Sequence, residues 1–284
     1  MRSVVEHVVR RVVPRGLRNW LRDPGASLQW LRDEAAFRLG RQPLLYLRPA
    51  LRVRCHPAAC RFWRANQIDD PEQAAEFDAF LAACTPEALL FDVGAHFGIF
   101  SLAAAIRGPR ARAVAIDPSP ASEAMVRLAA RLNGVQDRVI AVRAAVGAEK
   151  GTLPMLDVGP QAAGYFVWAE PGRHRRDVRQ VEVVTVDVLA GRFGSPTLLK
   201  IDVEGAEAAV LRGARTTLRG SAPPVVFLEL HNRMILGRGE CPDEVLTELC
   251  GAGYLLHDLG GAPRSPGWAL APDLVRLVAR RPEL

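Results

Sequence analysis

The chain has 284 residues, of which 49% are hydrophobic and 24% charged, so it can bury a sizeable core as one large domain with an appendage. The net charge of +6 comes almost entirely from dispersed arginines without interleaved aromatic residues, which argues against a nucleic-acid partner. Five cysteines without a Cys-x-x-Cys pair argue against a disulfide framework or a structural zinc site. No apolar run is long enough for a transmembrane segment, and we expect a cytoplasmic protein.

The first part of the chain, residues 1–70, is predicted to be a helical and extended appendage to a domain at 71–284. Valines from Val4 to Val13 fall at helical spacing, and a second helical pattern covers residues 28–39. We expect this extension to pack on the body of the protein or on another subunit. In the second case the protein forms an oligomer. The alternative is a basic amphipathic segment, within residues 1–40, that contacts a membrane surface peripherally.

The stretch before the central domain is predicted to be extended over residues 44–56. Asp69, Asp70, Pro71 and Glu72 then begin a helix, because acids and proline are typical of a first helical turn. This helix is predicted to end at about Cys84.

A strand that ends in an acid and a glycine-rich turn is the clearest local signal. The apolar run ends at Asp92, and Gly94 and Gly98 follow before a helical pattern begins at Ile99. Glycine permits backbone angles that a Cβ forbids and allows a ligand to approach closely, and free N–H groups at the helix start attract an anion such as a carboxylate. The order Asp-x-Gly-x-x-x-Gly lacks the third glycine of the dinucleotide pattern, so it fits the zwitterionic, cationic S-adenosylmethionine better than a pyrophosphate.

From residue 88 onward, strand and helix patterns alternate, which predicts a doubly wound, mostly parallel α/β sheet. The predicted strands are 88–93, 113–117, 139–142, 198–202, 225–230, 254–257 and, closing the sheet edge, 274–279; the predicted helices are 98–107, 119–133, 206–218 and 242–251. The alternation breaks over residues 151–187, where short extended pieces precede a strand at 181–186.

Acidic residues stand where several strands end. Asp117 lies 25 residues after Asp92, at the position where Rossmann-like folds place a ribose-binding acid; the alternative is that it caps the next helix. Asp202, Glu204 and Glu207 follow the strand at 198–202 and predict an acidic cavity mouth. The structural alternatives are complementation of a helix dipole and a buried pair of Asp202 with Lys200.

The strand at 225–230 ends beside a histidine. Glu229 and His231 are two residues apart and therefore share one side of the strand. Histidine is the side chain best suited to accept a proton near neutral pH, so His231 is a candidate general base; a structural histidine is the alternative.

The segment 157–180 is a candidate substrate lid. It is rich in glycine and carries Tyr165, Phe166 and Trp168, which are able to stack on a ring, followed by arginines that suit an acidic group. The alternative is a surface hairpin with a solvated run of charges.

Taken together, these segments resemble the FkbM family of S-adenosylmethionine-dependent methyltransferases. The resemblance covers residues 85–232 and rests above all on the run Lys-Ile-Asp-Val-Glu-Gly-Ala-Glu that ends at Glu207; Asp117 stands where many members carry Glu. It implies a Rossmann-like class I methyltransferase fold with a seven-stranded, mostly parallel sheet. It also implies O-methylation of a small-molecule or glycan acceptor, often a sugar or a secondary metabolite.

The site residues follow from the motifs and the resemblance. His231 and Asp202 are predicted to be catalytic by removing the proton of the acceptor. No metal is expected; Mg²⁺ held by Asp202, Glu204 and Glu207 is the alternative. An NAD-dependent oxidoreductase and a non-catalytic scaffold are the competing functions. The predicted cofactor-binding residues are Asp92, Gly94, Ala95, His96, Gly98, Asp117 and Ala145.

Overall fold

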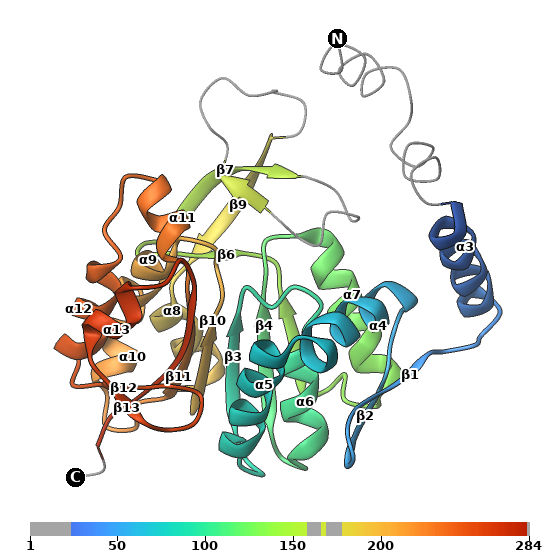
Figure 1. The fold of residues 1–284 in the computed structure, drawn as a ribbon, viewed down its shortest axis with the longest axis horizontal. Coiled ribbons are helices and arrows are strands. Elements are labelled where there is room, and N and C mark those ends of the chain that lie inside the picture. Colours follow the sequence, from blue (N-terminus) through green and yellow to red (C-terminus); the bar gives the residue numbers. More distant parts are fainter. Residues whose placement is uncertain (1–23, 158–165, 169–177, 283–284) are drawn as a thin grey trace.

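The structure, a computed structural model, describes residues 24–157, 166–168 and 178–282, and a twisted mixed sheet runs through its centre (Figure 1). β3, β4, β5, β10 and β11 are parallel, and the order reverses on either side of the β3–β10 pair, as in a doubly wound Rossmann-like sheet. The predicted fold class is confirmed. In spatial order the strands are β13 (Pro263–Arg264), β12 (Leu255–His257), β14 (Val275–Arg280), β11 (Val225–Leu230), β10 (Leu198–Ile201), β3 (Leu89–Val93), β4 (Arg112–Ile116) and β5 (Val139–Val142).

The last strand was expected at the edge of the sheet, and the structure corrects this prediction. β14 lies between β11 and β12 and is antiparallel to both. Residues 275–279 are all buried, with Leu277 facing one core and Val278 the other, and pairing with β11 and β12 satisfies the backbone groups on both edges of the strand. The short β13 pairs with β12 and adds an eighth strand to the seven that were predicted.

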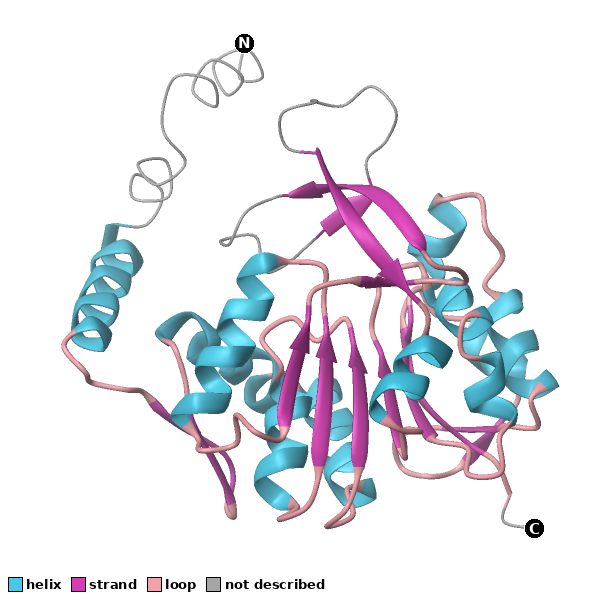
Figure 2. Cartoon of the chain, turned by 180° about the vertical axis from the view of Figure 1, so that it is seen from behind, coloured by secondary structure: helices cyan, strands magenta, loops and turns pink. Residues whose placement is uncertain are grey.

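Helices cover both faces of this sheet (Figure 2). Alternation along β3 explains the two layers, because Leu90 faces one core while Leu89 and Phe91 face the other. The first core contains Trp63 and Phe77 among its buried residues. Its helices are α4 (Pro57–Arg64), α5 (Pro71–Ala83), α6 (Ile99–Arg107) and α7 (Pro120–Leu132). The second core includes α8 (Val186–Phe193), α9 (Glu207–Arg212), α10 (Arg215–Arg219), α11 (Asn232–Gly237), α12 (Asp243–Gly251) and α13 (Pro266–Leu270).

The single helix predicted over residues 206–218 is two helices, α9 and α10. Gly213 separates them, and a Cβ at this position would lie 2.1 Å from the carbonyl oxygen of Gly147. Asp187 then accepts hydrogen bonds from the backbone N–H groups of Thr216 (3.0 Å) and Thr217 (2.8 Å), which satisfies donors in the first turn of α10. This break depends on a contact between segments far apart in sequence, so the helical pattern did not indicate it.

The residues before α5 are partly helical. The predicted extended stretch forms a hairpin of β1 (Leu44–Arg48) and β2 (Leu51–Arg54), followed by α4 and a π-helical turn, η1 (Ala65–Asp69), both of which the sequence analysis missed. The second predicted N-terminal helix is α3 (Pro24–Arg38), which contacts α4 through an Arg61–Asp33 ion pair of 2.9 Å. The valine-rich segment 4–13 lies outside the described residues.

A second, four-stranded sheet lies over the carboxyl ends of the main strands (Figure 1). Its strands are β6 (Ala145–Val146), β9 (Val178–Val184), β7 (Gly151–Asp157) and β8 (Phe166–Trp168), with β7 antiparallel to both β8 and β9. The segments 158–165 and 169–177 of the predicted lid, with Tyr165 and its arginines, lie outside the described residues.

Candidate active site

A cavity of about 750 Å³ opens at the carboxyl ends of β3, β4, β10 and β11. Open parallel sheets bind ligands at this edge, where the strand order reverses. Its lining includes every residue that the sequence analysis placed in the donor, catalytic or metal site except Gly98 and Glu207. The motifs therefore converge on one place.

The turn after β3 is held by contacts with the protein itself. Asp92 is buried, and its Oδ2 accepts hydrogen bonds from the N–H (3.1 Å) and Oγ (2.7 Å) of Ser101, which fixes the start of α6. Gly94 and Gly98 have φ angles of 80° and 74°. A Cβ would lie 1.8 Å from the Asp202 carbonyl oxygen at Gly94 and 2.8 Å from a Val126 methyl at Gly98. Positive φ and packing thus require glycine at both positions.

Next to this turn, His96 lines the cavity in a left-handed backbone conformation with φ of 48°. Its ring stacks on Phe97, with 3.8 Å between the centroids, and meets the ring of Phe62 edge-on at 4.3 Å. Burial lowers the pKa of His96 to about 4, so the ring is neutral at pH 7. Neither ring nitrogen has a hydrogen-bond partner within the described part of the chain.

Asp117 lies at the end of β4, where the ribose of the cofactor was expected. Its Oδ1 accepts from the N–H of Ser119 (2.8 Å) and its Oδ2 from the N–H of His96 (2.9 Å), which leaves acceptor capacity on both oxygens. Burial nevertheless raises the pKa of Asp117 to about 6. The helix-capping alternative is wrong, because the N-cap of α7 is Ser119. Ala145, in β6, lines the cavity beyond this point.

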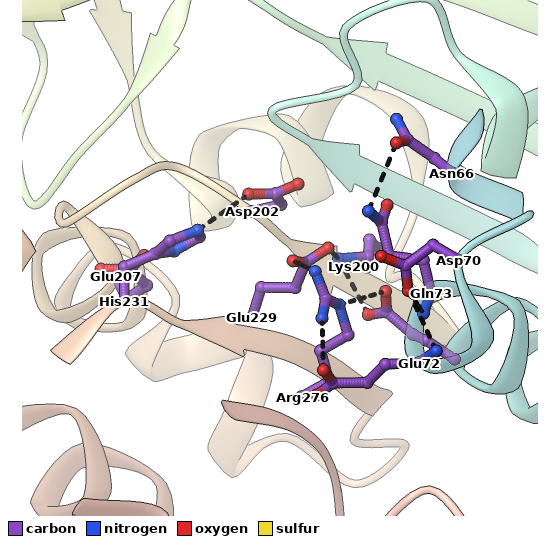
Figure 3. Close-up of polar contacts among 11 residues, drawn as sticks. Asn66, Asp70, Glu72, Gln73, Lys200, Asp202, Glu207, Glu229, His231 and Arg276 are labelled. Atoms are coloured by element: carbon purple, nitrogen blue, oxygen red, sulfur yellow. Dashed lines mark hydrogen bonds and ion pairs between the residues drawn. The ribbon is translucent and has the colours of Figure 1, made fainter. Parts of the chain in front are cut away.

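His231 stands between two carboxylates (Figure 3). Its Nδ1 lies 2.8 Å from Oε1 of the fully buried Glu207, and its Nε2 lies 3.7 Å from Oδ1 of Asp202. Burial alone would lower the pKa of His231, but the Glu207 hydrogen bond and the charges of both carboxylates raise it overall. Burial and the charge of Glu229 raise the pKa of Asp202 to about 7. The cavity thus holds a histidine and a carboxyl group whose pKa values are both raised, with 3.7 Å between their nearest atoms.

The acids of the turn after β10 have different surroundings. Glu204 lines the cavity with a φ of 53°, and burial raises its pKa to about 7. Backbone strain in a non-glycine residue of this kind concentrates at functional sites. Glu207 instead turns inward, where its Oε1 also accepts from the N–H of Gly205 at 3.0 Å.

Lys200 forms the centre of a buried ion network on the α5 face of the sheet. Its Nζ lies 2.9 Å from Glu229 Oε1 and 3.0 Å from Glu76 Oε1, and Arg276 lies 2.8 Å from the other oxygen of Glu229. The alternative that Lys200 pairs with Asp202 is therefore wrong. The two cations lower the pKa of Glu229 to about 2, against burial, whereas burial dominates at Glu76 and raises its pKa to about 8.

The structure groups different residues at the possible metal site than the sequence analysis did. Asp202, Glu229 and His231 have potential ligand atoms within 4.8 Å of one another, and this is the group of that kind found among the described residues. Of the acids named beside Asp202 from sequence, Glu207 is committed to His231.

Sequence reasoning missed Glu76, Arg276 and Gln67, all of which line the cavity or support its wall. The sequence contained a signal for Glu76. Lys200 lies in an apolar strand and requires buried anionic partners, and Glu76 precedes the buried Phe77 on a helix. No comparable signal marked Gln67.

The residues present fit S-adenosylmethionine. Carboxylates of Asp117, Asp202 and Glu204 line the cavity and suit its positive charges, and Asp117 retains acceptor capacity for ribose hydroxyls. Ala144, Ala145, Val146 and Gly147 also line the cavity.

Comparisons with known proteins agree with this assignment. The model of the methyltransferase FkbM domain matches residues 92–256, more than half of the chain. The methyltransferase sdnD of Sordaria araneosa is 29% identical over 154 residues, which cover 44% of this chain and 59% of that protein, so the chain spans less than two thirds of its relative.

Two solved structures are more distant. A methyltransferase FkbM from Methylobacillus flagellatus is 16% identical with a TM-score of 0.43, covering 68% of this chain and 43% of its own. An O-methyltransferase candidate from Nostoc punctiforme is 15% identical with a TM-score of 0.41, covering 79% and 60%. The assignment rests on the domain match: the chain belongs to the FkbM methyltransferase family.

Proposed function

We propose that the protein transfers the methyl group of S-adenosylmethionine to a hydroxyl oxygen of a small-molecule acceptor, of the sugar or secondary-metabolite kind that the resemblance implies. The observation that carries this proposal is His231, held by Glu207 at 2.8 Å and directed toward Asp202 at the cavity. A hydroxyl nucleophile loses a proton when it is methylated, and this arrangement provides a place for that proton.

The chemistry divides between the donor and the protein. When bound, S-adenosylmethionine supplies a methyl group on a positively charged sulfur. The acceptor oxygen displaces this sulfur in line, and the leaving group is S-adenosylhomocysteine, whose sulfur is neutral. The protein aligns the acceptor oxygen with that methyl group and takes its proton, and alignment alone supplies a large part of the rate.

His231 is the base in this proposal, and Glu207 is its positioning residue. An ionised Glu207 carboxylate only accepts hydrogen bonds, so the neutral imidazole donates from Nδ1–H to it and keeps the lone pair on Nε2. Asp202 then stabilises the imidazolium that forms, or shares its proton. The same relation between a base and an orienting carboxylate occurs in other enzymes that activate a hydroxyl.

The donor half of the proposal is tested first. We expect isothermal titration to give micromolar binding of S-adenosylmethionine and S-adenosylhomocysteine and none of NAD. Asp117→Ala is expected to weaken binding about 100-fold, since two hydrogen bonds to a charged group are lost. No binding of either sulfur compound by the wild type would favour the scaffold alternative.

The acceptor half needs a transfer assay. We expect methyl-¹³C from labelled S-adenosylmethionine to appear on oxygen in a library of hydroxyl compounds, with a rate about 10²- to 10⁴-fold lower for His231→Asn. His257→Asn, a histidine of β12 outside the cavity, is the matched control. Label on nitrogen or carbon, or an unchanged rate in His231→Asn, would contradict the proposal.

A further inference from the structure

A wall of uncharged polar side chains closes one side of the cavity. Asn66 and Gln67 come from η1 and Gln73 from the first turn of α5, and all three line the cavity. They precede residue 92, where the family match begins. This wall therefore lies outside the part of the chain that the family model matches.

Local sequence dictates the shape of this wall. The helix that begins at α4 widens into the π-helical turn η1, an uncommon element that occurs frequently at functional sites. It stops because Pro71 disfavours a helical conformation at Asp70, whose φ and ψ are −90° and 115°. Asp70 then caps α5 by accepting from the N–H groups of Glu72 and Gln73.

The wall contains hydrogen-bonding groups that the protein does not satisfy. Gln67 is 4% exposed, and its Oε1 has no donor among the residues that the structure describes. An unsatisfied buried acceptor destabilises the protein, and a ligand that donates a hydrogen bond to it would remove that cost. The two ring nitrogens of His96 are in the same state, and the Asn66–Gln73 bond is long, at 3.4 Å (Figure 3).

The charges nearby specify what kind of ligand fits. The amides and the neutral His96 carry no charge, and the adjacent cations Lys200 and Arg276 are already paired with buried carboxylates. A charged ligand would find no free counter-charge on this wall. Groups that both donate and accept, such as hydroxyls, match amides and a neutral imidazole, while Phe62 offers an apolar ring edge.

The wall is fixed relative to the reacting groups. Glu76, one turn beyond Gln73 on α5, ion-pairs with Lys200 at 3.0 Å, and Lys200, in β10, stands two residues before Asp202, which directly follows the end of that strand. A ligand held by the wall is thereby held at a set position with respect to Asp202 and His231. Such positioning is what an acceptor site requires.

Resting on the proposed methyl transfer, we propose that Gln67, Asn66 and Gln73 form the acceptor subsite together with the ring of His96, a residue that the sequence analysis assigned to the cofactor. We propose that this subsite takes an uncharged ring bearing several hydroxyl groups.

Saturation-transfer NMR on the full chain, with S-adenosylhomocysteine present, tests this subsite. The probes are methyl α-glucopyranoside, methyl α-mannopyranoside and myo-inositol, with glucuronate as the charged comparison. We compare wild type, Gln67→Leu and, as the matched control, Gln136→Leu, which removes an exposed amide outside the cavity. Thermal unfolding and titration of S-adenosylhomocysteine are measured on each protein.

We expect the wild type and Gln136→Leu to bind at least one neutral probe and to bind glucuronate at least tenfold more weakly. Gln67→Leu should lose at least tenfold in probe affinity, keep its affinity for S-adenosylhomocysteine, and keep its melting temperature because an unsatisfied acceptor is removed. The subsite is overturned if the wild type binds S-adenosylhomocysteine but no neutral probe, if Gln67→Leu binds the probe normally, or if it weakens S-adenosylhomocysteine equally. A wild type that does not bind S-adenosylhomocysteine overturns the proposed function, and the subsite with it.

Discussion

Two groups of charged residues lie side by side at the ends of β10 and β11, and they differ in how their charges are balanced (Figure 3). In the ion network, Lys200 lies 3.0 Å from Glu76 and 2.9 Å from Glu229, and Arg276 lies 2.8 Å from Glu229, so each cation contacts a buried acid. In the proton site, His231 faces Asp202 and Glu207, so acids are in excess. The two groups are nevertheless close in sequence: Lys200 and Asp202 are two residues apart, and so are Glu229 and His231.

The difference separates structural from reactive charges. Glu229, in contact with two cations, has its pKa lowered to about 2 and keeps one charge over the whole physiological range. Asp202, half-buried beside the cavity, has its pKa raised to about 7 by partial burial and by the charge of Glu229. Groups whose pKa lies near the operating pH are suited to proton transfer, whereas strongly paired groups are suited to holding elements together.

The largest effect is expected from removing the centre of the network. Lys200→Met leaves Glu76 and Glu229 buried without their common cation, and breaking a buried ion pair in this way costs about 3–5 kcal/mol of unfolding free energy. Urea unfolding measures it. Lys150→Met, at the only other lysine, is exposed and serves as the control. A loss within 1 kcal/mol of the control would show that the network is not structural.

The proton site should respond in the opposite way. A carboxyl group with a raised pKa costs stability once it is ionised, so Asp202→Asn is expected to be as stable as the wild type or more stable at pH 8. Its methyl-transfer rate should fall about 100-fold or more. Asp258→Asn, at an ion pair with Arg264 outside the cavity, is the control. A variant that is unstable but active would reverse our assignment of the two groups.

The comparison also explains what the sequence was able to predict. The strand ends that carry Asp92, Asp117, Asp202 and His231 were predictable, because local pattern fixes a strand and parallel strands end at one edge. The interior place of β14 was not, since it depends on pairing between distant segments. Nor was the π-helical turn that places Gln67 in the cavity wall, because no periodic pattern marks a five-residue element.

The pH dependence of transfer sharpens the role of Glu207. Its hydrogen bond raises the pKa of His231, and a base acts only when it is deprotonated, so the rate should rise as the pH passes upward through that raised pKa. Glu207→Gln removes the charge and weakens the bond. The rising limb should then move to lower pH, with a rate loss of about tenfold. A limb that stays in place, measured with saturating substrates from pH 5.5 to 9.5, would assign the titration to another group.

The smallest effect is expected from chelation, which tests whether Glu229, a member of the ion network, also acts with the proton site. Glu229 contributes to the cluster with Asp202 and His231, yet its two oxygens already contact Lys200 at 2.9 Å and Arg276 at 2.8 Å. A divalent cation there would lie close to two positive charges and would compete with both for the same carboxylate. We therefore expect transfer by the purified protein to change less than twofold in EDTA. A transfer rate that falls in EDTA and recovers with Mg²⁺ would mean that Glu229 acts with Asp202 and His231 and not only in the ion network.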